Sequence, residues 1–172
     1  MTASSTKLSG GAGAYPFDGA KEYIGGFIAR AGTITNTSAN GYDGHTLWGE
    51  STGVWATNFW LSSGQAKFRL FNWQDGDSGV GKQVSVDITP GLDTWLEYWR
   101  TGGQIWARAC DANGKRVSGP IAAGSYTPGY GNWSYGKGYV SSAFLDGAIS
   151  RHVHRPGFDS AFQTNMRARS EE

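Results

Sequence analysis

Short alternating runs of apolar and polar residues predict a chain built mainly from β-strands. The clearest runs lie in residues 92–114, where two segments rich in Trp, Leu, Tyr and Ile flank Gly102 and Gly103. The second segment stops at Asn113 and Gly114, a dipeptide that tolerates the positive φ of a tight turn. Both faces of each run carry bulky groups. This pattern predicts a central hairpin of a two-layer structure rather than an edge ribbon.

Further runs predict strands on either side of this hairpin. Gly25 and Gly26 interrupt the first strand and indicate a bulge or a close backbone approach. A second hairpin is predicted around the Ser-Ser-Gly turn at residues 62–64. The predicted strands outside the central hairpin are residues 22–31, 45–49, 54–61, 65–73, 83–88, 115–122 with a break at Pro120, and two short strands within 140–153.

Two segments differ from this strand pattern. Residues 124–139 contain five aromatic residues and five glycines without periodicity, and they are predicted to form a loop. Near the C-terminus Asp159 can cap a short helix from Ser160 to about Ala168. Residues Phe158, Phe162 and Met166 recur at intervals of four and would share one face of that helix.

Length and composition indicate a single domain. A compact chain of 172 residues buries roughly 70% of the surface of its unfolded form, so it can fold without disulfides. Residues 15–172 are predicted to form one β-sandwich domain. Residues 1–14 are mostly Ser, Thr, Gly and Ala, and we expect a flexible N-terminal arm there.

Charge and cysteine content exclude several classes of function. The net charge is +1 without a basic run, so nucleic acid is not an expected partner. The single Cys110 forms no intramolecular disulfide and has no recognisable base beside it, so it is interpreted as a packed thiol. The chain shows neither an export signal nor an apolar run of membrane-spanning length. No membrane partner is expected.

The order of the elements resembles the concanavalin-A-like, laminin-G-like jelly-roll superfamily. The resemblance rests on the opening strand 23–30, the paired strands within 59–71, the strand 84–88, the Asp-Thr-Trp entry into the central hairpin, and residues 144–149 before a terminal helix. It implies an all-β fold, a two-sheet antiparallel jelly-roll sandwich with one short C-terminal helix. Counterparts of the calcium-binding residues of some members are not found.

Some members of that superfamily are glycosidases, which normally hold two carboxylates about 5 to 10 Å apart. The best pair in this chain is Asp93 with Glu97, whose spacing along one strand is too long. We therefore interpret Glu97 as a structural residue and predict that the chain is not an enzyme.

Candidate metal ligands are few. His152 and His154 lie on the same face of a strand, a spacing that can chelate a transition metal. Arg151 and Arg155 flank them with repelling charge, so the pair is interpreted as two polar positions on a solvated strand edge. The acidic residues within 75–79 lack the spacing of a calcium-binding loop and indicate an Asp-Gly turn. No metal or cofactor is expected.

Aromatic side chains are the main candidates for a binding surface, since Trp and Tyr stack on sugar rings and on protein partners alike. Tryptophans within predicted strands, namely Trp60, Trp95 and Trp106, are assigned to the core. The hairpin group around Trp95 and Glu97 is therefore interpreted as structural, with function in the loops and the arm. The predicted ligand-binding residues are Tyr130, Trp133 and Tyr135 in the glycine-rich loop, with Trp73 and Trp48.

A composition typical of extracellular binding modules without an export signal is expected of a virion protein, made in the host cytoplasm and released by lysis. The first hypothesis is therefore a non-catalytic structural or binding protein of a bacteriophage particle, such as a capsid decoration or tail component. Its partners would be other virion proteins or copies of itself in a homo-oligomer. The alternative is a lectin-like carbohydrate-binding module, which could be extracellular if a signal has been removed. A glycoside hydrolase is the third and weakest hypothesis.

Overall fold

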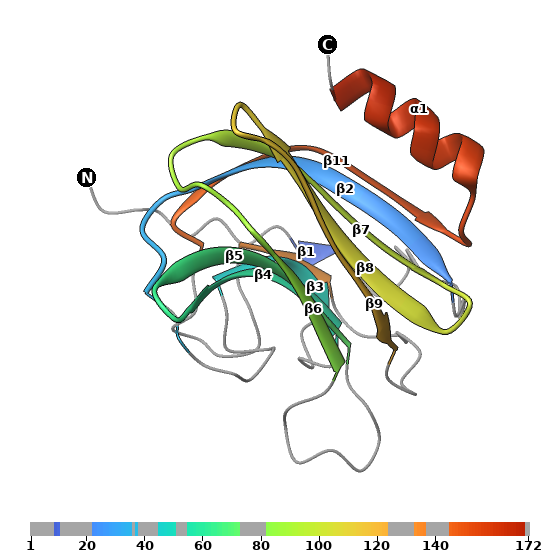
Figure 1. The fold of residues 1–172 in the computed structure, drawn as a ribbon, viewed down its shortest axis with the longest axis horizontal. Coiled ribbons are helices and arrows are strands. Elements are labelled where there is room, and N and C mark those ends of the chain that lie inside the picture. The colour runs from blue at the N-terminus through green and yellow to red at the C-terminus, as the bar shows by residue number, and fades with distance from the viewer. Residues whose placement is uncertain are drawn as a thin grey trace.

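The computed structural model describes residues 9–10, 22–35, 37, 45–50, 55–72, 82–123, 133–136 and 145–170. These residues form two antiparallel sheets that pack face to face, with one helix on the outside (Figure 1). The six-stranded sheet has the order β1 (Ser9–Gly10), β10 (Trp133–Tyr135), β3 (His45–Glu50), β4 (Trp55–Ser62), β5 (Gln65–Asn72) and β6 (Lys82–Asp87). The five-stranded sheet has the order β11 (Gly147–Pro156), β2 (Tyr23–Ala31), β7 (Asp93–Thr101), β8 (Gln104–Asp111) and β9 (Gly114–Ala122). The predicted all-β sandwich with one short C-terminal helix is confirmed.

The predicted central hairpin is the pair β7 and β8. Gly102 and Gly103 connect the two strands with φ of +56° and +72°, which side chains with a Cβ rarely adopt. β7 lies in the middle of its sheet, between β2 and β8. Because both faces of this sheet are covered, β7 is buried along nearly its whole length.

The core between the sheets is built from alternate residues of each strand. From the five-stranded sheet Phe27, Leu96 and Tyr98 point inward, and none of these side chains is exposed. Phe68 and Leu70 of β5 meet them from the other sheet. Burial of each such side chain stabilises the fold by roughly 1.5 to 3 kcal/mol.

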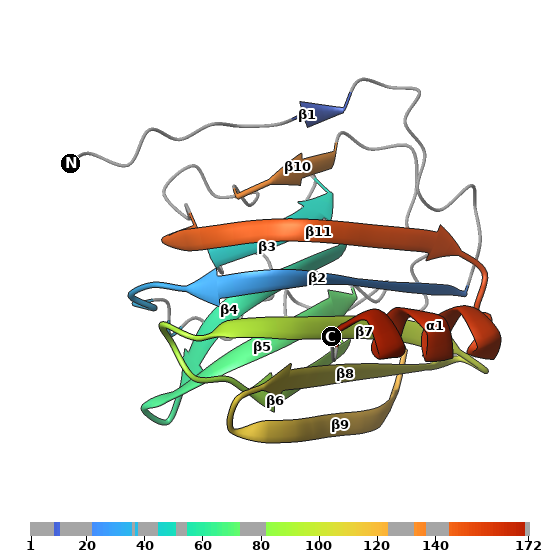
Figure 2. The same cartoon turned by 90° about the horizontal axis from the view of Figure 1, so that it is seen from above.

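Helix α1 (Ser160–Ser170) covers the outer face of the five-stranded sheet. Figure 2 shows it lying along the strands, above β7. Asp159 Oδ1 accepts hydrogen bonds from the backbone N–H groups of Ala161 at 2.9 Å and Phe162 at 3.1 Å, so the predicted cap is confirmed. Met166 and the partly buried Phe162 pack on a second apolar cluster that includes Trp95.

Gly25 and Gly26 allow the side chains of Tyr98 and Trp95 to lie close to the backbone of β2. Of the two predicted alternatives, a bulge or a close approach, the structure shows the close approach. A Cβ on Gly25 would lie 2.3 Å from the Tyr98 hydroxyl oxygen, and one on Gly26 would lie 2.7 Å from Cζ2 of Trp95. The irregularity of register is in the neighbouring strand β11, between Ser150 and Val153.

Three segments differ from the prediction. The aromatic-rich segment 124–139 contains β10, which pairs with β3 on one side and β1 on the other. A strand of three residues is too short to produce an alternating pattern. β1 lies within the predicted N-terminal arm. β9 continues through Pro120, which an edge strand tolerates because one of its sides needs no ladder hydrogen bond.

In the described part of the chain, α1 is too short and too polar to cross a membrane.

Candidate functional site

His152 and His154 point into the sandwich, so their interpretation as a solvated strand edge is wrong. β11 pairs with β2 and places both imidazoles over the inner face of the sheet. The Tyr98 hydroxyl oxygen lies 3.2 Å from Nε2 of His152 and 3.0 Å from Nδ1 of His154. The Tyr135 hydroxyl from β10 makes a hydrogen bond with Nδ1 of His152. The two histidines thus belong to a network of hydroxyl and imidazole groups at one end of the core.

Trp48 packs on this network and does not present a face to solvent. It is 3% exposed, and its ring centroid lies 4.5 Å from that of His152 and 4.7 Å from that of His154. Its expected role as part of an exposed contact surface therefore needs correction. Tyr135 is half-buried beside it, at 6.3 Å between ring centroids.

The other predicted binding residues lie partly or wholly outside the described residues. Tyr130 and Trp73 are outside them, as is the segment 75–79. Trp133 is described only as the backbone of β10, where it pairs with Glu50. Their predicted role stays a prediction.

Burial disfavours the charged forms of His152, Tyr98 and Tyr135. Desolvation lowers the pKa of His152 to about 4. It raises the pKa of Tyr135, and burial together with neighbouring tyrosines raises that of Tyr98 well above its usual value. Within the described part of the chain, His, Cys, Asp and Glu form no group of three that could hold a metal ion. The two tyrosine hydroxyls and the two imidazoles are joined by hydrogen bonds within the core.

Glu97 lies on the opposite, outer face of β7 and is not exposed. Its Oε2 accepts hydrogen bonds from Arg108 Nη1 at 3.1 Å and Arg167 Nε at 3.0 Å. Its Oε1 accepts from Arg167 Nη2 at 2.7 Å and Gln163 Nε2 at 2.6 Å. We refer to Glu97, Arg108, Gln163 and Arg167 as the Glu97 cluster.

Asp93 formed the best candidate carboxylate pair with Glu97 in the sequence, a pair that was rejected for its long spacing. Four residues of extended strand separate the two by about 13 Å, which exceeds the spacing that glycosidases use. The Asp93 carboxylate instead accepts hydrogen bonds from Arg30 Nε at 2.9 Å and from Arg30 Nη2 at 2.6 Å. The structure therefore does not bring the two carboxylates together.

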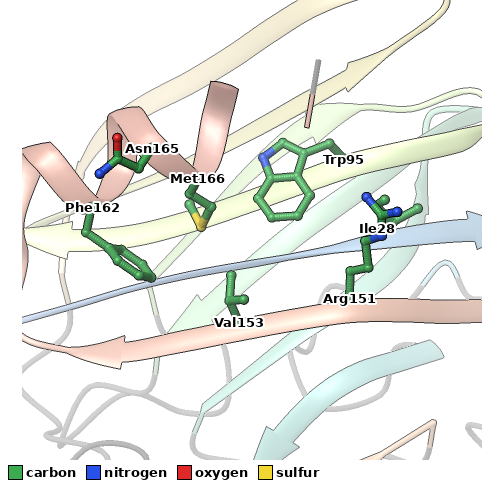
Figure 3. Close-up of a pocket in the computed structure, with 7 residues that line it drawn as sticks. All are labelled: Ile28, Trp95, Arg151, Val153, Phe162, Asn165 and Met166. Carbon is green, nitrogen blue, oxygen red and sulfur yellow. The ribbon is translucent and has the colours of Figure 1, made fainter. Parts of the chain in front are cut away.

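A pocket of about 470 Å³ opens beside the Glu97 cluster, between α1 and the outer face of the sheet (Figure 3). We call it the α1 pocket. Strands β2, β7 and β11 supply one wall, and the helix supplies the other. Figure 3 shows Trp95 standing between Met166 and Arg151. The lining residues are Ile28, Trp95, Arg151, Val153, Phe162, Asn165 and Met166.

Sequence reasoning missed this pocket because it placed Trp95 and Trp106 in the core. Trp95 is 7% exposed, yet it faces α1 and lines the pocket. Trp106 is half-buried on the same outer face and stacks on Trp99 at 5.7 Å, with 6° between the ring planes. Trp60 is half-buried on the outer face of the other sheet, with Arg69 at 4.6 Å over its ring. Trp95 is buried in the second apolar cluster, as its interpretation as a structural residue requires, and it also lines the pocket.

Arg151 was noted in the sequence only as a charge beside the histidines. It occupies the irregular part of β11 with φ of +48°, which is uncommon for a residue with a Cβ. Its side chain is exposed at the pocket. Among the described residues, none forms a hydrogen bond or ion pair with its guanidinium. No sequence signal marks such a position when it lacks glycine.

No protein-family model matches the sequence, and no curated protein matches it. The fold is similar to several solved structures. One is the enzymatically active domain of tailspike protein 2 of bacteriophage CBA120, with a TM-score of 0.58 and 12% identity over 94% of this chain and 25% of that chain. The full-length tailspike protein 2 from the Escherichia coli O157:H7 bacteriophage gives a TM-score of 0.59 and 14% identity over 97% of this chain and 23% of that chain.

A third similar structure is Domain 4 of AbnA, a GH43 extracellular arabinanase from Geobacillus stearothermophilus, in complex with arabinotriose. Its TM-score is 0.54 and its identity 13%, over 86% of this chain and 66% of that chain. This chain spans about a quarter of the length of the tailspike chains. At these identities the likeness shows a shared fold, the two-sheet β-sandwich.

Proposed function

We propose that this chain is a non-catalytic binding domain of a bacteriophage tail. The carrying observation is the similarity to tailspike protein 2, which extends over at least 94% of this chain but only 23 to 25% of the tailspike chains. The sandwich would serve as a structural module that binds other virion proteins or copies of itself.

The Glu97 cluster supports the non-catalytic part of the proposal. A general acid or base must exchange a proton with substrate, and it must therefore be within hydrogen-bond reach of it. The Glu97 carboxylate is buried and accepts from two arginines and an amide. Activity assays on cell-wall and capsular polysaccharides should show no hydrolysis. Hydrolysis that Glu97→Gln abolishes in a folded protein would contradict this part.

Antibody labelling tests the proposed location. Particles produced from the genome that encodes this chain would be labelled with an antibody against the purified protein and viewed by electron microscopy. We expect label at the tail. Label confined to the capsid, or particles without label, would overturn the assignment to the tail.

Glycan binding is a second candidate function. It is favoured by the fold shared with the arabinanase domain, which was solved with arabinotriose bound. Calorimetric titration with arabinotriose and a glycan array would be performed on the full chain. The variant Trp133→Ala should weaken any binding by about tenfold or more, whereas Lys67→Ala on β5 should not. Equal affinity of Trp133→Ala and the unmodified protein would remove the predicted aromatic site.

A further inference from the structure

We propose that the α1 pocket binds a small apolar carboxylate of about the size of an aromatic or branched amino acid. This site is distinct from the predicted loop aromatics. It does not depend on the proposed tail function, because the described lining residues belong to the helix and the five-stranded sheet and serve no step of that proposal.

The size and lining of the pocket fit an apolar body. Its volume of about 470 Å³ falls within the range of about 300 to 1,000 Å³ that is usual for small-molecule sites. Ile28, Val153, Phe162 and Met166 line it, and Val153 keeps 38% of its surface exposed. Filling the pocket would therefore remove apolar surface from water, which is the main source of affinity in such sites.

The charge at the pocket fits an anionic group. The Arg151 guanidinium can donate two parallel hydrogen bonds to a carboxylate. The acidic groups of the surrounding elements are already paired with other arginines. Asp93 binds Arg30 at 2.6 Å, and Asp159 of the helix cap binds Arg155 at 2.7 Å. The third acidic residue, Glu97, forms ion pairs with Arg108 and Arg167.

Two further donors accompany Arg151. The Trp95 indole nitrogen is buried and has no acceptor among the described residues. A buried donor without an acceptor destabilises the fold, and a ligand that supplies an acceptor would relieve this cost. Asn165 of α1 is also among the residues that line the pocket. A carboxylate that reaches between helix and sheet would supply acceptors to these groups.

The lining favours an apolar acid over a sugar. A sugar ring carries several hydroxyl groups, and each one that is buried needs a hydrogen-bond partner. Among the described lining residues, Arg151 carries a charged side chain and Asn165 an amide, and the others are apolar apart from the Trp95 N–H. Most hydroxyl groups of a sugar would lose water without a replacement. An apolar body with one carboxylate would not.

Titration with N-acetyl-L-phenylalanine tests the proposal, and N-acetyl-L-phenylalaninamide is the matched neutral ligand. Binding to the full chain would be measured by ¹H–¹⁵N NMR, which reports the Trp95 indole N–H directly. We expect the acid to shift this signal and to bind about tenfold or more tightly than the amide. Equal binding of the two ligands, or no binding of the acid at millimolar concentration, would overturn the proposal.

Variants at Arg151 separate binding from folding. Arg151→Gly removes the charge at a backbone conformation that glycine adopts readily, so the fold should be kept. It should weaken binding of the acid by about tenfold or more and leave binding of the amide unchanged. Lys67→Gln, on the other sheet, should bind as the unmodified protein does. Unchanged binding by Arg151→Gly, or tighter binding of glucuronate than of the apolar acid, would contradict the assignment.

Discussion

The Glu97 cluster and the α1 pocket lie side by side where the helix meets the sheet. The cluster holds a buried, paired charge, whereas the pocket has an exposed charge at its edge. Glu97 and Trp95 are two positions apart on the same face of β7. The Glu97 carboxylate is fully buried and bound by Arg108, Arg167 and Gln163. Arg151, at the pocket, is exposed and has no partner among the described residues.

The difference follows from burial. An uncompensated charge inside a protein costs several kcal/mol, so the carboxylate of Glu97 must be paired for α1 to dock over it. An exposed guanidinium remains solvated and needs no partner. Adjacent stripes of the same helix serve the two regions, since Gln163 and Arg167 reach Glu97 while Phe162 and Met166 face the pocket. The charges fix the helix, and the space beside it is left available for a ligand.

Removal of the buried carboxylate should have the largest effect. Glu97→Ala would remove the carboxylate that forms an ion pair with Arg108, whose side chain is 5% exposed. We expect a loss of about 3 to 5 kcal/mol in the free energy of unfolding. Urea denaturation followed by tryptophan fluorescence would measure it. Asp93→Ala is the matched control, because its ion pair with Arg30 is exposed and should contribute little. Similar losses in both variants would contradict the contrast between buried and exposed charge.

Low pH should destabilise the protein through His152, which follows Arg151 in β11 and is packed on the inner face. The pKa of His152 is about 4 in the folded protein and about 6.5 in the unfolded chain. Between these values the unfolded chain binds the proton and the folded protein does not, so stability falls as the pH drops from about 6.5 to about 4. It should not fall further from this group below pH 4, and above pH 6.5 it is fully retained. The loss amounts to about 3 kcal/mol.

Denaturation profiles of the unmodified protein and His152→Gln would isolate this effect. His154, Tyr98 and Tyr135 also face His152, and they remain in both proteins. The difference in stability between the two proteins should therefore change with pH only over the window of His152. A difference that is constant from pH 4 to 7 would show that His152 takes up its proton over the same pH range in the folded and in the unfolded protein.

The elements that were predicted from sequence have strong local signals. The β7–β8 hairpin has two long alternating runs around Gly102 and Gly103, and α1 has its Asp159 cap with apolar residues at intervals of four. What alternation does not determine is which face of a strand is the inner one. Trp48 was predicted as part of a contact surface and lies in the core, while Trp106 was assigned to the core and lies on an outer face.

The bulge in β11 explains why the α1 pocket could not be predicted. Ile149 and Val153 are four positions apart, so unbroken alternation would place them on the same face. The structure instead directs Ile149 into the core and Val153 to the pocket, because the register shifts between Ser150 and Val153. Arg151 takes up the shift at positive φ, where glycine or asparagine would have been the recognisable signal.

A smaller effect is expected at Gly26, which lies under the Trp95 ring. A Cβ there would stand 2.7 Å from Cζ2 of Trp95 and 2.7 Å from the backbone oxygen of Leu96. Gly26→Ala should therefore cost about 1 to 3 kcal/mol and displace Trp95 toward the pocket. Thermal unfolding and the Trp95 indole signal in NMR would report both changes. Ser150→Ala, at a neighbouring exposed position of β11, should alter neither. An unchanged Trp95 signal in Gly26→Ala would contradict the prediction that the added Cβ displaces the Trp95 ring.

The smallest effect should be a gain in stability at Arg151. A residue with a Cβ at φ of +48° costs roughly 1 to 2 kcal/mol, and glycine avoids this cost. Glycine also gains conformational freedom in the unfolded chain, which offsets part of the benefit. Arg151→Gly should thus be more stable than Arg151→Ala by about 1 kcal/mol or less in urea denaturation. Both variants lack the guanidinium, so their difference reports the backbone alone. If Arg151→Gly is the less stable of the two, the backbone at this bulge is not strained. A more stable Arg151→Gly that no longer binds the apolar acid would show that the native arginine is kept at a cost to folding, which the Glu97 cluster does not incur.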